Sequence, residues 1–342
     1  MTARGAGGSL PRYIVQRLLL VIPMIWILLT VVFLLLRVAP GDPVTAAFGG
    51  KLTEEELDSR RASLGLDRPL FVQYLEYLGS VARFDFGTAM TDKRSIISII
   101  QDNGGATLTL TIGAFVIALL IGIPLGLLAG RMRDSVPDVI IRIFGIVTYA
   151  APVFWTGLLV VLLVAPTGWP TYGIASEITQ FEVEPVTHII LIDALLQGNT
   201  NAAIDVLQHH LLPCFVLGVF LSGVFIRLVR VNLLQTLKGD YVEAARARGV
   251  AEKHVVRRHA FRNALVPVVT VIGLQAALTL SGAVLTETTF SWPGIGKVLV
   301  DYITDKDYAA VQGIVTFFAI VVMIVSLLVD IINALIDPRV RY

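Results

Sequence analysis

Few side chains in this 342-residue sequence combine the type and spacing that metal binding or catalysis requires. The best candidates for metal ligands are His209, His210 and Cys214, because His210 and Cys214 lie four residues apart and would share one face of a helix. A structural zinc site takes four ligands, so this set is too small to form one. We expect these side chains to pack at the outer end of an apolar segment, and we expect no metal and no cofactor in the chain.

Motifs for nucleotide binding and hydrolysis are missing. No Gly-x4-Gly-Lys-Ser/Thr occurs, and in GIGKV the position of the first glycine is taken by Ser291, while Val298 follows the lysine. Neither His-Glu-x-x-His nor Gly-x-Ser-x-Gly is present, so an intramembrane hydrolase would lack its metal ligands or its nucleophile. The chain is therefore not expected to be an enzyme.

Glu287 is an ionisable residue at the outer end of an apolar segment. An acid in that position of a membrane protein is a functional candidate, here for a transport pathway or its outer gate. A carboxylate that simply lies at the water interface would explain the same position equally well.

The stretch DYVEAARARGVAEKH, residues 240–254, is unusually charged for its place between two apolar segments. It has the chemistry of a docking helix. Asp240 is expected to cap a helix whose third position is Glu243, and both acids favour the positive end of the helix dipole. An alanine pair allows close approach, a tyrosine supplies an aromatic anchor, and a glycine permits a left-handed helix end. The candidate docking residues are Asp240, Tyr241, Glu243, Ala244, Ala245 and Gly249.

The apolar segments themselves predict the fold class. Hydrophobic residues make up 55% of the chain and charged residues only 15%, as in polytopic membrane proteins. Five runs contain no Asp, Glu, Lys or Arg and approach the roughly 20 residues that cross a bilayer. A sixth run is shorter but is followed by two arginines that can extend toward headgroups. The predicted fold is an all-α protein with six transmembrane helices at residues 18–36, 107–130, 143–166, 211–226, 264–286 and 309–329.

The distribution of basic residues predicts the orientation. Nine of the 27 Lys and Arg lie within residues 227–262, whereas residues 167–208 contain none, although they carry five acids. The positive-inside rule therefore places the loop 232–262 and both termini in the cytoplasm.

The chain is expected to have three parts. Residues 1–38 hold the N-terminus and first span, residues 39–103 form a small extracytoplasmic helical subdomain, and residues 104–342 form the core with five spans. Within the subdomain, Thr53 and Glu56 have the spacing of a capping box, and Pro69 opens a second helix. On that helix the residues expected to share one apolar face are Phe71, Leu75 and Leu78.

Several of these stretches resemble one family. EAARARG (residues 243–249) resembles the cytoplasmic EAA loop of binding-protein-dependent ABC importer permeases, the helix that fits a cleft on the ATPase subunit. The general family pattern continues with Ile-x-Leu-Pro, whereas RHAFRNALVPVVT is similar to the variant of the peptide/nickel branch. Further stretches that resemble this branch are FLLLRVAPGDPV, LGLDRPLFVQYLEYL, LTETTFSWPGIGKVLVD and LLVDIINALIDPRVR, and EPVTHIILIDALL looks most like dipeptide permeases.

The resemblance implies a permease subunit of a bacterial inner-membrane importer that works by alternating access on dipeptides or short oligopeptides. The implied partners are a second permease, two ATPases that bind ATP and Mg²⁺, an extracytoplasmic binding protein and membrane lipid, but not nucleic acid. Residues 39–103 are expected to receive the binding protein or to shape the outer mouth.

Two alternatives remain at this stage. Nickel or another small ligand could be the cargo, because the branch shares its membrane motifs. A channel belongs to a different class, but no ring-forming selectivity sequence or regular arginine spacing is present, and it would leave the docking helix unexplained.

The predicted topology can be tested by thiol labelling after Cys214 is replaced. A cysteine at Glu182 should react with an impermeant thiol reagent added to intact cells, whereas one at Arg246 should not. Labelling in the reverse pattern would contradict the six-span arrangement.

Overall fold

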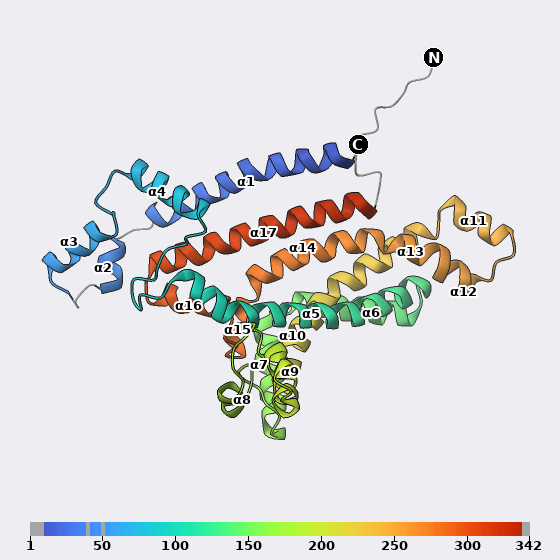
Figure 1. Ribbon diagram of the computed structural model, residues 1–342. Coiled ribbons are helices and arrows are strands. Elements are labelled where there is room, and N and C mark those ends of the chain that lie inside the picture. The colour runs from blue at the N-terminus through green and yellow to red at the C-terminus, as the bar shows by residue number, and fades with distance from the viewer. Residues whose placement is uncertain (1–9, 39–41, 49–51, 337–342) are drawn as a thin grey trace, which may run out of the picture.

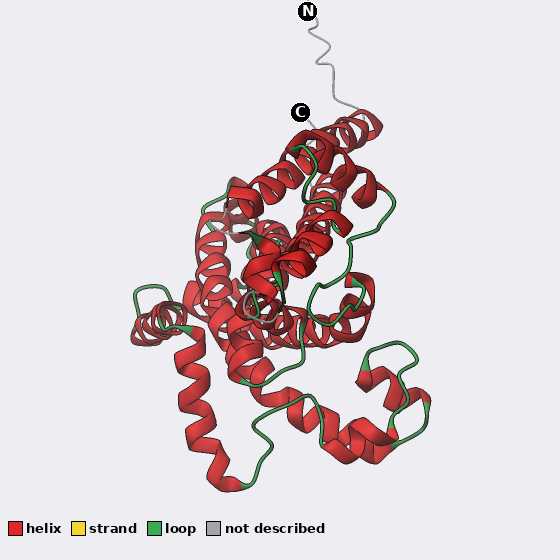
Figure 2. Cartoon of the chain, turned by 90° about the vertical axis from the view of Figure 1, so that its left-hand side faces the viewer, coloured by secondary structure: helices red, strands yellow, loops and turns green. Residues whose placement is uncertain are grey.

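The computed structural model describes residues 10–38, 42–48 and 52–336, and the described chain is built from helices (Figures 1 and 2). Four helices are long and apolar enough to cross a membrane, which confirms an all-α chain with several apolar helices. They are α1 (Leu10–Val38), α5 (Ile96–Arg131), α10 (Thr200–Thr236) and α17 (Tyr308–Ile336). The predicted cytoplasmic ends of the chain, residues 1–9 and 337–342, lie outside the described residues.

The predicted span 143–166 is not one straight helix. It is divided between α6 (Val136–Ala150) and α7 (Val153–Val164), which are bent by 101° relative to each other. Ala151 is extended, with ψ of 131°, and Pro152 follows it without an N–H to continue the helix. The prediction of a continuous span at this place is wrong, and α7 projects away from the long helices (Figure 1).

The predicted spans 211–226 and 264–286 also differ from the helices observed. α10 is 37 residues long and continues through Pro213, so the short apolar run is only its middle. The fifth run is divided between α14 (Val266–Gly282) and α15 (Val284–Thr289). Because α14 has only 17 residues, it falls short of the length of the four long helices.

α5 and α10 pack against each other at very short range. A Cβ atom added to Gly126 of α5 would lie 2.7 Å from the Cβ of Val229 and 2.8 Å from the carbonyl oxygen of Ile226, both on α10. Elsewhere along the same contact, the rings of Phe115 of α5 and Phe225 of α10 meet edge to face, with centroids 6.2 Å apart. Close backbone approach of this kind is how apolar helices associate in a membrane.

Short helices complete the two ends of the molecule. α2 (Pro43–Phe48), α3 (Glu54–Ser63) and α4 (Leu70–Ala82) lie at one end, and α11 (Asp240–Ala247) and α12 (Glu252–His254) lie at the other (Figure 1). The start of α1 and the end of α17 point toward the α11 end. The remaining helices are α8 (Glu177–Glu182), α9 (Ile190–Leu196), α13 (Phe261–Ala264), α16 (Ile295–Thr304), a 3-10 turn at Ala165–Thr167 and a π-helical turn at Val255–Ala260.

The predicted starts of α3 and α4 are confirmed, but the predicted face of α4 is not buried. The capping box of Thr53 and Glu56 is present, and Pro69 is the residue before α4. Phe71 and Leu75, however, are 69% and 51% exposed, so they do not form the core of a subdomain. α4 instead contacts α1 through the adjoining side of its apolar face, which includes Tyr74.

The α5–α10 contact leads to a stability prediction. Gly126→Ala should lower the free energy of unfolding by about 1–3 kcal/mol, because the added methyl overpacks the contact. Gly104→Ala, in the same helix, is a matched control, since its Cβ would lie 3.6 Å from the nearest side chain. Thermal unfolding of the detergent-solubilised protein is the measurement, and equal midpoints for the two variants would contradict the close contact.

Candidate functional site

The charged loop between α10 and α14 folds around a small hydrophobic core of its own. Buried residues from the end of α10, from α11 and from the turn that follows α12 meet in one cluster. The loop is therefore a packed unit at the end of α10 rather than a solvent-exposed, unpacked segment. The described members of the cluster are Leu233, Val242, Ala245, Val255, Val256, Ala260 and Ala264.

α11 begins one residue earlier than its sequence suggests. The cap residue is Gly239, in an extended conformation, and no side chain caps the helix. Asp240 is the first helical residue and Glu243 lies in the first turn, so both carboxylates still complement the positive end of the helix. The expectation that Asp240 is the cap is wrong, but its electrostatic contribution remains.

The end of α11 is the turn that the sequence predicts. Gly249 has φ of +75°, a left-handed conformation that favours glycine. The N–H of Gly249 donates to the carbonyl of Arg246 at 2.9 Å, and the N–H of Val250 donates to the carbonyl of Ala245 at 3.2 Å. These two bonds form a Schellman motif and satisfy carbonyls at the helix end.

The two alanines of the EAA motif face in different directions. Ala245 is fully buried in the core of the loop, whereas Ala244 is exposed. The expectation that both form the docking surface is therefore wrong for Ala245. Tyr241, Ala244 and Arg248 recur at helical spacing and are exposed, so they define one accessible side of α11. We call these three residues the α11 outer face.

An ion pair that the sequence analysis did not identify braces the loop. Arg246 donates from Nε to Glu252 Oε2 at 3.0 Å and from Nη2 to Glu252 Oε1 at 2.7 Å, across the Gly249 turn. These hydrogen bonds lower the pKa of Glu252 and raise the pKa of Arg246. Because the Glu252 pKa is lowered on folding, the stabilisation is present at neutral pH and is lost as pH falls through the folded pKa. Arg246 and Glu252 are six residues apart, whereas ion pairs along a helix join residues three or four apart, so the sequence did not indicate this pair.

Glu287 lies at neither a water interface nor an open surface. It is fully buried in α15, and its carboxylate accepts hydrogen bonds from Thr107 Oγ1 at 2.7 Å and from the N–H of Lys297 at 2.9 Å. Gly294 packs so closely that a Cβ there would lie 2.2 Å from the carboxyl carbon. The position of a carboxylate at the start of α16 is favourable for the helix dipole. The water-interface interpretation is wrong, and the outer-gate role stays a prediction.

The same contact ties three helices together. Thr107 of α5 also accepts from the N–H of Ile295 at 2.9 Å, and Trp292 donates from Nε1 to the carbonyl of Ala106 at 2.8 Å. The Trp292 ring meets His210 of α10 edge to face at 4.5 Å. We call this group, Ala106, Thr107, His210, Glu287, Trp292 and Ile295, the outer clasp.

The candidate metal ligands are used in packing. His210 Nδ1 lies 2.7 Å from the carbonyl oxygen of Val206, and the Cys214 thiol is 3.8 Å from the carbonyl oxygen of Leu110. His209 Nδ1 lies 2.8 Å from the carbonyl oxygen of Asp205. Among the described residues, no group of three or more His, Cys, Asp or Glu could hold a metal ion.

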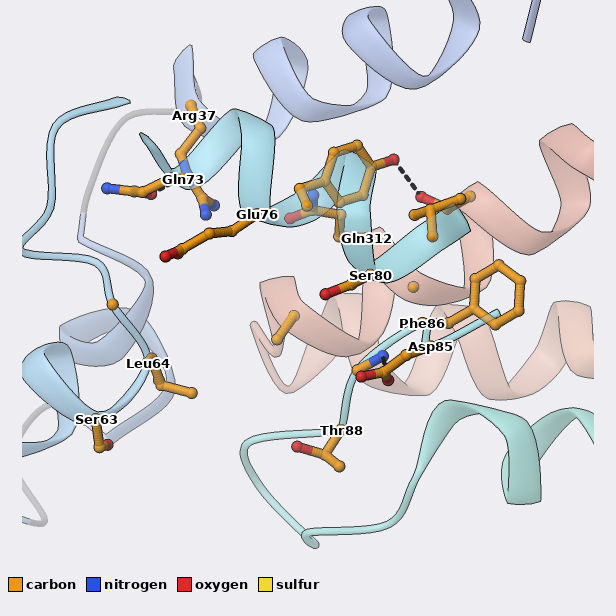
Figure 3. Close-up of a pocket in the computed structure, with 17 residues that line it drawn as sticks. Arg37, Ser63, Leu64, Gln73, Glu76, Ser80, Asp85, Phe86, Thr88 and Gln312 are labelled. Atoms are coloured by element: carbon orange, nitrogen blue, oxygen red, sulfur yellow. Dashed lines mark hydrogen bonds between the residues drawn. The ribbon is translucent and has the colours of Figure 1, made fainter. Parts of the chain in front are cut away.

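A cleft of about 480 Å³ lies at the opposite end from α11 (Figure 3). It is lined by the end of α1, by α3 and α4 and by the first turns of α17. Arg37 donates from Nε to Gln73 Oε1 at 3.0 Å and stacks on Phe33, with 5.1 Å from the guanidinium carbon to the ring centroid. Tyr77 and Thr316 share a hydrogen bond of 2.7 Å. None of the sequence-predicted site residues lines this cleft.

The chain thus has the fold of a helical membrane protein, with a separately packed charged loop at the end of α10. The family described as "Binding-protein-dependent transport system inner membrane component" matches residues 122–342, and the corresponding N-terminal family matches residues 10–111. The chain belongs to this family.

Individual relatives match almost the whole chain. It is 38% identical, over 96% of its length and 98% of the relative, to the di/tripeptide transport system permease protein DppB of Pseudomonas aeruginosa. It is 37% identical to the dipeptide transport system permease protein DppB of Escherichia coli K12, over 97% and 99% of the two chains. It is 33% identical to the oligopeptide transport system permease protein AppB of Bacillus subtilis, over 96% and 99%. These matches confirm the family resemblance.

The outer clasp gives a prediction that separates structural support from gating. Glu287→Ala removes the acceptor of buried donors and should lower the free energy of unfolding by about 1–3 kcal/mol. Glu177→Ala, an exposed acid on α8, is the control and should leave stability nearly unchanged. The thermal midpoint of the purified protein is the measurement. An unchanged midpoint together with lost transport would favour a gate over a clasp.

Proposed function

We propose that this chain is the membrane-embedded permease subunit of an ATP-driven importer for dipeptides or short oligopeptides. The observation that carries this proposal is the near-complete match to permeases named for dipeptide, di/tripeptide and oligopeptide transport. Those names favour peptide cargo over nickel. The chain itself forms the pathway and binds neither ATP nor Mg²⁺.

The proposed complex contains a second, similar permease, two ATPases and an extracytoplasmic binding protein. In its membrane arrangement, the bent α6–α7 pair and the short α14 join the four long helices to give six crossings. Both termini lie on the cytoplasmic side with α11. This orientation is supported by the concentration of Lys and Arg in residues 227–262. It is also supported by the start of α1 and the end of α17, which both point toward the end of the molecule where α11 lies (Figure 1).

The α11 outer face is the proposed contact with the ATPase. Tyr241 supplies an aromatic side chain, and Ala244 beside it leaves room for a partner backbone. Asp240, Glu243 and Gly249 set the start, polarity and end of the same helix. When ATP closes the ATPase dimer, α11 moves with it. Because Val242 and Ala245 pack against Leu233, that movement reaches α10 directly.

A transport measurement tests the cargo. The chain is reconstituted in proteoliposomes with its partner permease, ATPases and binding protein. These vesicles should accumulate a radiolabelled dipeptide only when ATP is present on the side of the membrane that carries the ATPases. Excess unlabelled dipeptide should abolish the signal, and radioactive nickel should not accumulate. Nickel uptake without peptide uptake would overturn the peptide assignment, and passive flux without ATP would indicate a channel.

The α11 outer face yields a specific mutational prediction. Ala244→Asp should leave membrane abundance normal, because the side chain is exposed in the free chain. It should reduce the ATPase that copurifies by at least tenfold, because docking would bury an unpaired charge at a cost of several kcal/mol. Copurification of the tagged permease with its ATPases is the measurement.

Two controls sharpen this test. Lys253→Gln, on an exposed residue of α12, should retain the ATPase. Ala245→Asp should behave differently from Ala244→Asp, because it places a charge in the loop's own core and should lower the stability of the permease itself. Normal ATPase recovery by Ala244→Asp would mean that α11 is only a solvated surface.

A further inference from the structure

α4 has one broad apolar face, and only part of it is packed. Tyr74 shares a hydrogen bond of 2.6 Å with Thr30 of α1, and the rings of Tyr74 and Tyr77 lie 5.3 and 5.6 Å from Phe33. The rest of this face carries large side chains that are exposed. Leu70, Phe71 and Leu75 are 62%, 69% and 51% exposed. A water-facing helix of a small subdomain would be polar on this side.

The contacts of α4 place it at the depth of the bilayer. Thr30 lies within the charge-free run of α1, seven residues before Arg37, which corresponds to about 10 Å along a helix. Thr316, the partner of Tyr77, lies within the charge-free run of α17. α4 therefore touches two spanning helices on the apolar side of their ends rather than beyond them.

α1 also exposes apolar side chains just before its end. Leu34 and Leu35, in the last turns of α1, are 51% and 66% exposed. Arg37 then follows, held by Gln73 of α4 beside the cleft (Figure 3). An arginine at the end of an apolar helix marks the level of the headgroups. Along α4 itself, Glu76 is the one charged residue, and it pairs with Arg68 before the helix starts.

We propose that α4 is an interfacial membrane helix, with Leu70, Phe71 and Leu75 immersed in the acyl chains of the outer leaflet. Its partner is the phospholipid hydrocarbon itself. The Tyr74–Thr30 and Tyr77–Thr316 hydrogen bonds hold the helix beside the apolar parts of α1 and α17. An amphipathic helix in this position stabilises the outer ends of α1 and α17 by burying apolar area in lipid.

This assignment divides the predicted subdomain in two. α3 carries three acids in its first turn and two arginines in its last, and it remains on the aqueous side. The surface of residues 39–103 that can receive a water-soluble binding protein is then limited to α3 and its flanking loops. α4 is excluded from that contact because lipid covers it.

Site-directed spin labelling of the complete transporter in phospholipid vesicles tests the proposal. Single cysteines replace Phe71 or Leu75 in a Cys214→Ala background, and each cysteine is labelled with a nitroxide. The accessibility of each nitroxide to oxygen and to a water-soluble nickel chelate is then measured. Collision with oxygen should exceed collision with the chelate at both sites. Leu35→Cys on α1 provides the lipid reference, and Glu55→Cys on α3 should give the opposite, aqueous pattern.

Each outcome decides the question. Lipid-like values at positions 71 and 75 support the proposal. Greater access for the nickel chelate would overturn it and return α4 to the aqueous surface. Low access for both reagents in the complex would also overturn it, because the second permease would then cover this face. Transport activity enters none of these readouts, so the test is independent of the cargo.

Discussion

The close contact between α5 and α10 is the constraint on which the rest of the structure depends. Lipid chains are as apolar as leucine, so helices in a membrane gain little from hydrophobic burial and associate through close packing. Gly126 supplies that packing by allowing α5 to reach the backbone of α10. The consequence is a difference in burial. In the most apolar 18-residue stretch of each helix, 67% of the residues are buried in α10, compared with 17% in α1 and in α17. α10 is the central helix, and the others are arranged around it.

Because α10 is continuous over 37 residues, it joins the two groups of residues with functional potential. At one end His210 contacts Trp292 of the outer clasp, and at the other Leu233 belongs to the core of the charged loop. Near the loop, Arg230 donates to the buried carboxylate of Asp138 at 2.6 and 2.7 Å, which fixes α6 to α10. Breaking such a pair would leave a buried charge without its partner, so the two helices move together. In the proposed coupling, a displacement of the loop would therefore reach α6 as well as α10.

Local sequence patterns predicted the features that depend on local physics. The charge-free runs located α1, α5 and α17, the spacing of Thr53 and Glu56 predicted a capping box, and Gly249 predicted a left-handed helix end. Features decided by tertiary contacts could not be predicted in this way. Pro152 ends a helix whereas Pro213 lies inside one, because the surroundings decide whether a chain continues past a missing N–H. The same limit explains α4, whose apolar face is broader than its contact with α1, and the sequence did not indicate which part would pack.

The charged loop shows why a conspicuous motif and a docking surface are not the same set of residues. A helix of eight residues is not stable alone, so α11 needs a packed side to hold its position. Val242 and Ala245 form that side, which is why half of the alanine pair is buried. The exposed residues that the core does not use are Tyr241, Ala244 and Arg248, and these form the proposed docking surface. Core and outer face are then two sides of one short helix. In the proposed coupling, a force applied to the outer face would pass through Ala245 and Val242 into α10, so the packing that orients the helix would also transmit its motion.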